Sequence, residues 1–286
     1  MTALADQLAA LGLRATATHL DDLVALATKR RWSARQLLEH LAETEQQDRS
    51  RRSLERRLTA SHIGRFTPMT DFDWTWPKRI DRGAVEAALR LDFLADARNI
   101  CLVAAQGLGK TMIAQNLAYA AVLAGHRVLF TTAAQLLLDL GSQESARSLA
   151  RRLHHYASCT LLVIDEIGYL SYDARAADLL FQVVSQRYER RSLVLTTNLP
   201  FSEWTNIFPN AATATALIDR VVHHAEILTI EGDSFRRRVA EPGANPHPPP
   251  EGRRIKFRRF YMSGDTRPRS PTWRASAGSP ACPRSA

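Results

Sequence analysis

The sequence has few cysteines and no long apolar run. Its three cysteines, Cys101, Cys159 and Cys282, lie far apart and form no C-x-x-C pair. This spacing indicates buried or free thiols in a reducing compartment rather than a disulfide framework. No apolar run approaches the roughly 20 residues of a membrane-spanning helix, and the first residues lack the basic start of a signal peptide. We therefore expect a cytoplasmic protein with no membrane partner.

Acidic residues are too few to balance the basic ones. The 286 residues include 38 Lys and Arg against 29 Asp and Glu, a formal net charge of +9. Such a charge favours a polyanionic partner such as DNA, although a solvated basic surface is the alternative. With 45% hydrophobic residues, the chain is long enough for one full-sized domain with smaller additions.

A phosphate-binding loop is the most informative motif. The apolar run from Ile100 to Val103 predicts a strand, and a helical pattern follows the glycine-bearing turn after it. The loop residues are Ala104, Ala105, Gln106, Gly107, Leu108, Gly109, Lys110, Thr111 and Met112. They match G-x-x-x-x-G-K-[ST], in which backbone N–H groups wrap ATP phosphates, the lysine reaches the β- and γ-phosphates and the threonine hydroxyl binds Mg²⁺. Ala104 replaces the first glycine, so its methyl group must fit where glycine permits unusual backbone angles.

Two carboxylates follow a second apolar run, Leu161 to Ile164, which predicts a central strand. Asp165 and Glu166 would then lie at the carboxyl edge of the sheet, beside the phosphate-binding loop. There Asp165 can hold Mg²⁺ through water, and Glu166 can polarise the water that attacks the γ-phosphate.

Three further polar residues are candidates for contact with the γ-phosphate. Asn198 follows the predicted strand from Leu193 to Thr196, and can bind the attacking water or simply form the turn before Pro200. Arg220 closes a predicted helix, and Arg236 follows the next predicted strand. Both arginines can act electrostatically on phosphate oxygens.

The chain divides into three predicted regions. Residues 1–66 form a small helical N-terminal domain that docks a partner or DNA, with a capping box at Ser33 and Gln36. Residues 67–240 alternate strand and helix, which predicts an α/β fold with a central parallel sheet flanked by helices. Residues 241–286 form a basic, Pro-rich tail that we expect to be disordered. The tail either adds nonspecific DNA affinity or has no role.

Two basic clusters are candidates for DNA contact. The first consists of Arg49, Arg51, Arg52, Arg56 and Arg57, and the second of Arg147, Arg151, Arg152 and His154. Neither includes a motif that reads base edges, so binding would be largely independent of DNA sequence. The alternative for the first cluster is a solvated face paired with Glu43, Glu45, Asp48 and Glu55. Three aromatic residues, Phe72, Trp74 and Trp76, either anchor the linker to the next domain or stack on bases.

Together these segments resemble the IstB-like ATP-binding proteins, which are AAA+ transposition helper ATPases related to the DnaC helicase loaders and DnaA initiators. The resemblance extends from the N-terminal helices to about Arg238. The matching segments are FDW at 72–74, GLGKT at 107–111, LLVIDEIGYL at 161–170, LTTN ending at Asn198, ALIDR ending at Arg220 and GDSFR at 232–236. The resemblance implies an AAA+ P-loop fold, with Asn198 as the sensor-1 residue, Arg220 as a finger that acts on a neighbour's ATP and Arg236 as the sensor-2 residue.

The function that the resemblance implies is Mg²⁺-dependent ATP hydrolysis by a protein that forms ATP-dependent homo-oligomers on DNA and assists an insertion-sequence transposase. Two alternatives stay open. A helicase loader would use its N-terminal helices to dock a replicative helicase. A non-hydrolysing DNA-binding scaffold would keep nucleotide binding and lack turnover.

Overall fold

The computed structural model describes residues 3–169 and 171–234. The α-helices of this part are α1 (Ala3–Ala10), α2 (Arg14–Thr18), α3 (Leu20–Arg30), α4 (Ala34–Ser61), α5 (Arg82–Leu89), α6 (Lys110–Leu123), α7 (Ala133–Gly141), α8 (Ala146–Ser158), α9 (Ala174–Arg187) and α10 (Ala211–Val222). The strands are β1 (Asn99–Ala104), β2 (Val128–Thr132), β3 (Leu161–Ile167), β4 (Ser192–Thr197) and β5 (Ala225–Ile230). Helix and strand alternate from α5 onward, as the sequence pattern predicts.

The five strands form one parallel sheet in the order β2-β3-β4-β1-β5. The three central strands β3, β4 and β1 each contain an apolar run and are buried along almost their whole length, as expected for strands covered on both faces. Their carboxyl ends meet at one edge of the sheet, so the segments after β1, β3 and β4 are neighbours. This arrangement confirms the predicted α/β fold with a central parallel sheet.

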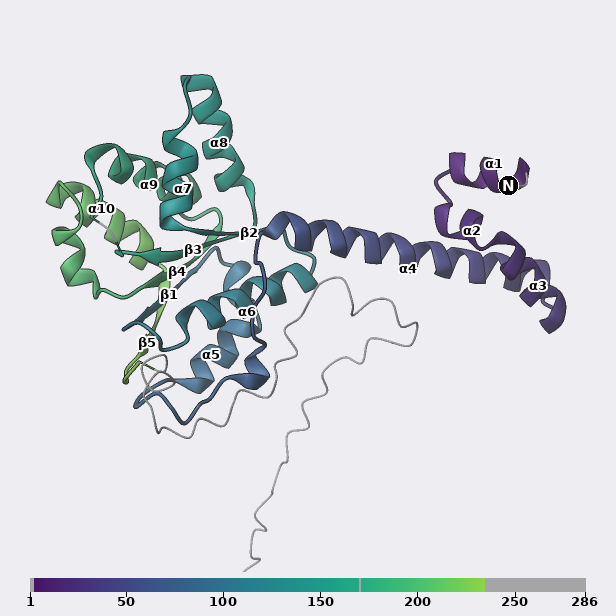
Figure 1. Ribbon diagram of the computed structural model, residues 1–286, viewed down its shortest axis with the longest axis horizontal. Coiled ribbons are helices and arrows are strands. Elements are labelled where there is room, and N and C mark those ends of the chain that lie inside the picture. Colours follow the sequence, from purple (N-terminus) through teal and green to yellow (C-terminus); the bar gives the residue numbers. More distant parts are fainter. Residues whose placement is uncertain (1–2, 170, 235–286) are drawn as a thin grey trace, which may run out of the picture.

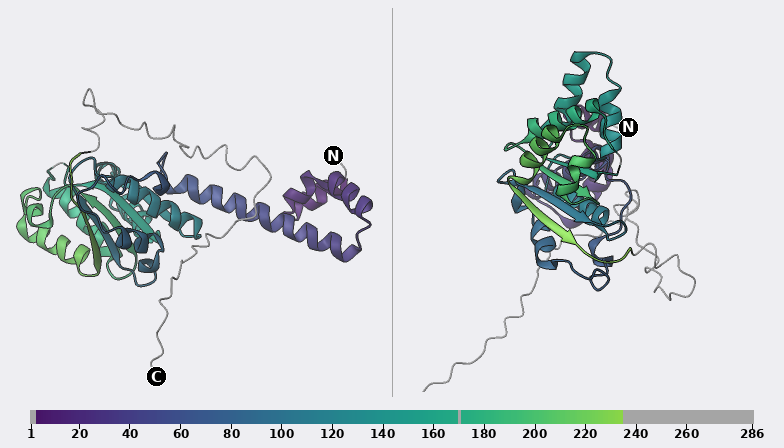
Figure 2. Two further views of the ribbon diagram at one scale, coloured as in Figure 1. Left: turned by 90° about the horizontal axis from the view of Figure 1, so that it is seen from below. Right: turned by 90° about the vertical axis from the view of Figure 1, so that its left-hand side faces the viewer.

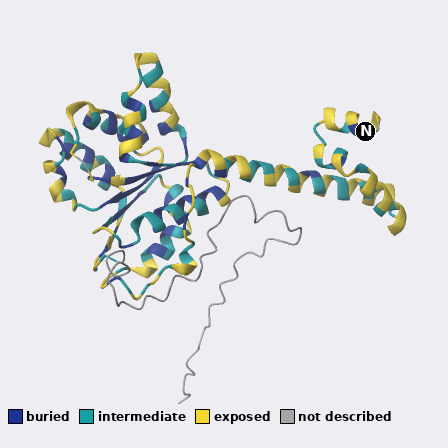
Figure 3. Ribbon diagram, viewed as in Figure 1, coloured by how far each residue is buried: buried dark blue, intermediate teal, exposed yellow. Residues whose placement is uncertain are grey.

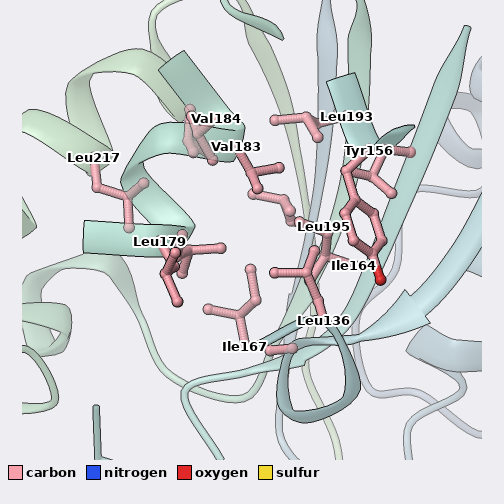
Figure 4. Close-up of a cluster of buried hydrophobic side chains, with 14 of the residues drawn as sticks. Leu136, Tyr156, Ile164, Ile167, Leu179, Val183, Val184, Leu193, Leu195 and Leu217 are labelled. Atoms are coloured by element: carbon pink, nitrogen blue, oxygen red, sulfur yellow. The ribbon is translucent and has the colours of Figure 1, made fainter. Parts of the chain in front are cut away.

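Helices cover both faces of the sheet and create two apolar clusters (Figure 1). One cluster lies between the sheet and helices α7, α8, α9 and α10, and Figure 4 shows its central side chains. The other cluster lies between the sheet and helices α5 and α6, with the last turns of α4 added to it. The core therefore has the three-layer form of an α/β domain.

Helix α4 is a long rod that extends from the sheet and carries α1, α2 and α3 at its far end (Figures 1 and 2). It begins with the predicted capping box of Ser33 and Gln36. Most of the rod is half-buried or exposed (Figure 3), but Leu58 in its last turns is buried in the core and Arg57 Nε donates to Val122 O at 3.3 Å. The small helical N-terminal region precedes the sheet as expected.

The domain limits at residues 66 and 240 stay predictions. Because Leu58 and Arg57 of α4 pack against the sheet domain, the rod and the domain are joined by side-chain contacts as well as by the chain. The predicted tail at 241–286 lies outside the described residues.

A fully buried arginine connects the end of α9 to the end of α8 and to the start of β4. Arg187, at the end of α9, has no exposed surface. Its Nη1 donates to Tyr156 O at 2.7 Å and Cys159 O at 2.9 Å, and its Nη2 donates to Ser192 O at 2.6 Å. Burial lowers the pKa of Arg187 from its usual value. The guanidinium therefore satisfies carbonyls where α8 ends and where β4 begins.

The cysteines behave as predicted where the structure describes them. Cys101 and Cys159 are buried free thiols, and burial raises the pKa of Cys101 to about 12. Cys282 lies outside the described residues. Within the described part of the chain, no helix combines the length and apolar character that crossing a membrane requires.

Candidate nucleotide-binding site

The phosphate-binding loop connects β1 to α6 at the carboxyl edge of the sheet. Gly107 and Gly109 both have left-handed backbones, with φ of 79° and 88°, which glycine adopts without strain. A Cβ at Gly107 would lie 2.3 Å from Ser234 Oγ, and one at Gly109 would lie 2.6 Å from Phe72 Cε2. Gly109 also precedes α6 without a side-chain cap. The first N–H groups of α6 are thus available to an anion, as at other helix N-termini that bind phosphate.

Lys110 lies inside the loop. Its Nζ donates to Ala104 O at 2.6 Å and to Ala105 O at 2.8 Å. These contacts hold the ammonium group over the same turn that the glycines shape. Leu108 attaches the loop to the domain, because its side chain is buried in the apolar core.

Ala104 does not require the backbone freedom of glycine. It is the last residue of β1, it is buried, and it pairs with Ile230 of β5. Its φ lies outside the left-handed region, unlike that of Gly107 and Gly109. Alanine at this position therefore carries no backbone strain, and the predicted difficulty with its methyl group does not arise.

The Mg²⁺ ligands predicted from the sequence, Thr111 and Asp165, are in contact. Thr111 Oγ1 donates to Asp165 Oδ1 at 3.2 Å, although 54 residues separate the two. Thr196 Oγ1 of the neighbouring strand β4 donates to the same carboxylate oxygen, and Asp165 is buried. Thr196 was missed by the sequence analysis because nothing in the chain order shows that β4 lies directly beside β3.

Glu166 stands out by its backbone. Its φ is 62°, in the left-handed region, and it lies where the register between β3 and β4 shifts. Its amide N–H donates to Thr196 Oγ1 at 2.9 Å, while its side chain is exposed. A non-glycine residue held in this conformation costs about 1–3 kcal/mol, and such strain collects at functional sites. At this bulge the side chain of Glu166 is exposed, whereas the other residues of β3 are buried.

The remaining predicted site residues do not all lie at the same edge of the sheet. Asn198 directly follows β4, which lies between β1 and β3, so it stands at the same edge as the loop and Asp165. Arg220 is near the opposite edge, because the end of α10 leads into the first residue of β5. Its Nη1 donates to Ala216 O at 3.1 Å, and its guanidinium lies 4.6 Å from the ring centre of Phe181. Arg236 lies outside the described residues.

Two segments flank the loop, and the sequence analysis predicted only part of this arrangement. The aromatic residues Phe72, Trp74 and Trp76 pack against the core cluster, which confirms that they anchor the linker. Trp76 Nε1 donates to Asp233 O at 2.9 Å, so the linker and the segment after β5 meet beside the loop. Asn116 of α6 was missed: it accepts from Met69 N at 3.0 Å and donates to Thr67 O at 2.9 Å.

A basic groove runs along α4 and corresponds to the first predicted cluster. Its lining residues are Gly12, Arg14, Arg49, Arg52, Glu55, Arg56, Thr59, Ala60 and His62. Asp48 pairs with Arg51 and Arg52, each at 2.7 Å, so the predicted alternative of internal pairing holds for these two. Within the described residues, Arg49 and Arg56 form no ion pair, and both are exposed. Glu45 does not face the arginines, because it is buried and accepts from Thr16 N at 2.8 Å.

The second predicted cluster is smaller than expected. Arg152 does not point freely outward: its Nε donates to Asp139 Oδ2 at 2.5 Å, and Tyr156 donates to the same oxygen at 2.6 Å. Burial raises the pKa of Asp139, but these two hydrogen bonds outweigh it and hold that pKa below its usual value. Arg147, Arg151 and His154 remain exposed on α8.

Comparison with known proteins places this site in a family. The sequence profile described as "IstB-like ATP binding protein" matches residues 6–241. A Pseudomonas aeruginosa protein of insertion sequence IS21, named for ATP binding, is 34% identical over 218 residues, which cover 76% of this chain and 82% of that protein. A Bacillus thuringiensis subsp. berliner protein of insertion sequence IS232, also named for ATP binding, is 33% identical over 226 residues, 79% of this chain and 90% of that protein.

Solved structures align with part of the chain. The structure of DnaI has a TM-score of 0.47 at 18% identity and covers 57% of this chain and 90% of its own. The structure of the DnaC helicase loader has a TM-score of 0.44 at 20% identity and covers 56% of this chain and 96% of its own. The profile match, which spans the loop, the β3 carboxylates and the N-terminal helices, shows that this chain belongs to the IstB-like ATP-binding protein family.

Proposed function

We propose that this protein hydrolyses ATP with Mg²⁺, assembles on DNA as an ATP-dependent homo-oligomer and assists the transposase of its insertion sequence. The observation that carries the proposal is the meeting of Lys110, Thr111 and Asp165 at one sheet edge, with Glu166 exposed beside them. These are the groups that phosphoryl transfer needs, because its catalysis rests on positioning and on charge stabilisation.

The residues present fit a magnesium ion. Mg²⁺ prefers oxygen ligands and usually keeps several of its waters. Thr111 Oγ1 and Asp165 Oδ1 are 3.2 Å apart, so the hydroxyl could bind the ion directly and the carboxylate could hold it through water. A bound magnesium ion supplies neutralisation of phosphate charge.

The remaining steps fall to side chains at the same edge. Glu166 accepts a proton from, or orients, the attacking water, because its exposed carboxylate faces away from the core. Asn198 offers an amide to the same water or to the γ-phosphate. Lys110 exchanges its two loop carbonyls for phosphate oxygens, which are the stronger partners of an ammonium group.

Arg220 acts in a neighbouring subunit under this proposal. In its own chain it lies near the opposite edge of the sheet from Lys110, so it cannot serve its own nucleotide without a large movement. A cation that reaches the γ-phosphate of the next subunit stabilises transition-state charge only after assembly. The assignment is supported by the resemblance of the ALIDR segment to the family, and this segment lies within the matched residues 6–241.

Mixing two inactive variants tests the neighbour role. Arg220→Ala and Glu166→Gln should each bind ATP and hydrolyse it at least 100-fold more slowly than the parent protein. In mixed oligomers some interfaces join an intact Glu166 to an intact Arg220, so the rate of phosphate release should exceed the sum of the separate variants. A matched control is Arg175→Ala, on the exposed start of α9. Absence of recovery despite demonstrated co-assembly would disprove the assignment.

The α4 groove is the surface that we assign to the DNA backbone. Arg49, Arg52 and Arg56 lie at i, i+3 and i+7, on one face of the helix and within about 10 Å along its axis. Arg14 of α2 completes the same groove. Cations at such spacing contact phosphates and not base edges, so they support binding that is independent of sequence.

The double variant Arg49→Ala with Arg56→Ala tests the groove. Both arginines are exposed and unpaired within the described residues, so their loss should weaken duplex binding roughly tenfold and reduce the slope of log K against log salt by about 2. Titrations of unrelated duplexes at several salt concentrations with ATP measure both quantities. The control double variant is Arg35→Ala with Arg90→Ala, two exposed arginines outside the groove. Equal losses in both double variants would argue against a specific role for the groove.

The complete proposal is tested by assembly and by partner choice. Electron microscopy of the protein with ATP and duplex DNA should show ordered oligomers on the duplex. A pull-down should retain the transposase encoded by the same insertion sequence. Retention of a replicative helicase instead would favour a helicase loader, and ATP binding without turnover, with or without DNA, would favour a scaffold.

A further inference from the structure

Two histidines and a glutamate meet where α9 and α10 end. This cluster lies at the amino ends of the strands, and the nucleotide site lies at their carboxyl ends. Glu189 follows α9, His223 closes α10, and His224 leads into β5. One ligand atom from each of these exposed residues lies within 4.8 Å of the others. We propose that Glu189, His223 and His224 form a surface site for a divalent transition-metal ion, with Zn²⁺ as the representative ligand.

The distance between two of the three groups matches metal coordination. His224 Nε2 and Glu189 Oε1 are 3.3 Å apart. In a tetrahedral zinc site with bonds of about 2.0–2.1 Å, neighbouring ligand atoms are separated by roughly 3.4 Å. The imidazole of His224 and the carboxylate of Glu189 can therefore bind one ion with almost no movement, and the third ligand atom, on His223, lies within 4.8 Å of both.

A neighbouring tyrosine can set the tautomer of the third ligand. Tyr188 Oη and His223 Nδ1 are 2.7 Å apart. When Nδ1–H donates to the hydroxyl, Nε2 keeps its lone pair for a metal ion. A histidine that binds a metal typically donates its other ring N–H to an oxygen in this way, which orients the ring.

The backbone and the charges around the cluster also favour a cation. Two helices, α9 and α10, end at the site, and helix C-termini carry partial negative charge. Glu189 has a left-handed backbone with φ of 56°, a strained conformation for a residue with a side chain.

The donor set indicates which metals would bind. Two imidazole nitrogens and one carboxylate suit Zn²⁺, Ni²⁺ or Cu²⁺ and disfavour Mg²⁺, which prefers oxygen alone. With three protein ligands, a fourth position remains for water. The site does not share a residue with the nucleotide site, so its occupancy can be measured without ATP.

Calorimetric titration of the full chain with Zn²⁺, without nucleotide and without a histidine tag, tests the proposal. The protein should carry Cys282→Ser and His247→Ala, so that these tail residues cannot supply ligands. We expect one ion per chain. Glu189→Gln, His223→Ala and His224→Ala should each weaken binding at least tenfold, while the exposed His154→Ala on α8 should leave it unchanged.

Absorption spectroscopy with Co²⁺ provides a second measurement that is independent of calorimetry. Co²⁺ in the site should give visible absorption bands of a tetrahedral or five-coordinate complex, and these should disappear in His224→Ala. Circular dichroism should show that the variants remain folded. The proposal is wrong if the chain binds no Zn²⁺ at millimolar concentration, or if binding survives in the triple variant of Glu189, His223 and His224.

Discussion

Replacing Lys110 by alanine is expected to abolish ATP hydrolysis, with a loss of at least 100-fold in turnover. The ammonium group lies over the loop and donates to Ala104 O and Ala105 O, and under the proposed function it would donate to β- and γ-phosphate oxygens instead. Removing it takes away a fixed positive charge at the point where negative charge moves during phosphoryl transfer. A steady-state assay of phosphate release, with and without DNA, measures the effect.

Two controls separate this effect from a general loss of structure. Lys29→Ala removes an exposed lysine on α3, far from the loop, and should hydrolyse ATP at the parent rate. Lys110→Arg keeps the charge but changes its geometry, and should recover only part of the activity because the loop is shaped around a compact ammonium group. If Lys110→Ala turned over ATP at the parent rate, the catalytic site would have to lie elsewhere.

Replacing Arg187 by methionine is expected to lower the free energy of unfolding by about 3 kcal/mol. Methionine fills a similar volume but donates no hydrogen bond. It would leave the carbonyls of Tyr156, Cys159 and Ser192 buried without their partner, and each such loss costs about 1–3 kcal/mol. Relief from burying a charge returns part of that cost.

Thermal and denaturant unfolding measure this change. A loss of about 3 kcal/mol corresponds to a fall of roughly 10 °C in Tm for a chain of this size. Arg190→Met provides the matched control, because Arg190 is exposed three residues further along and its loss should change stability by less than about 0.5 kcal/mol. Equal midpoints for Arg187→Met and the parent would show that the buried guanidinium is not a structural support.

The sequence alone was sufficient for the features that depend on neighbours along the chain. The glycines and lysine of the loop, the capping box at Ser33 and the apolar runs of β1 and β3 are local patterns with local physical causes. The carboxylates Asp165 and Glu166 were placed at the sheet edge because parallel strands end on the same side. These features predicted the fold class and placed the loop at the carboxyl edge of the sheet.

Pairs of distant residues could not be predicted in the same way. The hydrogen bonds from Thr196 to Asp165 and from Asn116 to the linker depend on strand order and helix packing, and chain spacing does not encode either. Arg152 was predicted to belong to a cluster that contacts DNA, but it forms an ion pair with Asp139 on α7. The helical period shows which face a residue occupies, and it does not show which side chain on another element is within reach.

Backbone conformation accounts for the remaining differences. The alanine at position 104 looked unsuited to its place because the motif usually has glycine there, whereas the structure gives Ala104 an ordinary strand conformation. Glu166 has the left-handed backbone instead, although nothing in the sequence around it indicates strain. Residue identity and period therefore determined the phosphate-binding loop and the layered α/β fold. The tertiary structure alone decided which side chains meet and where the backbone is strained, because both depend on the packing of segments far apart in the chain.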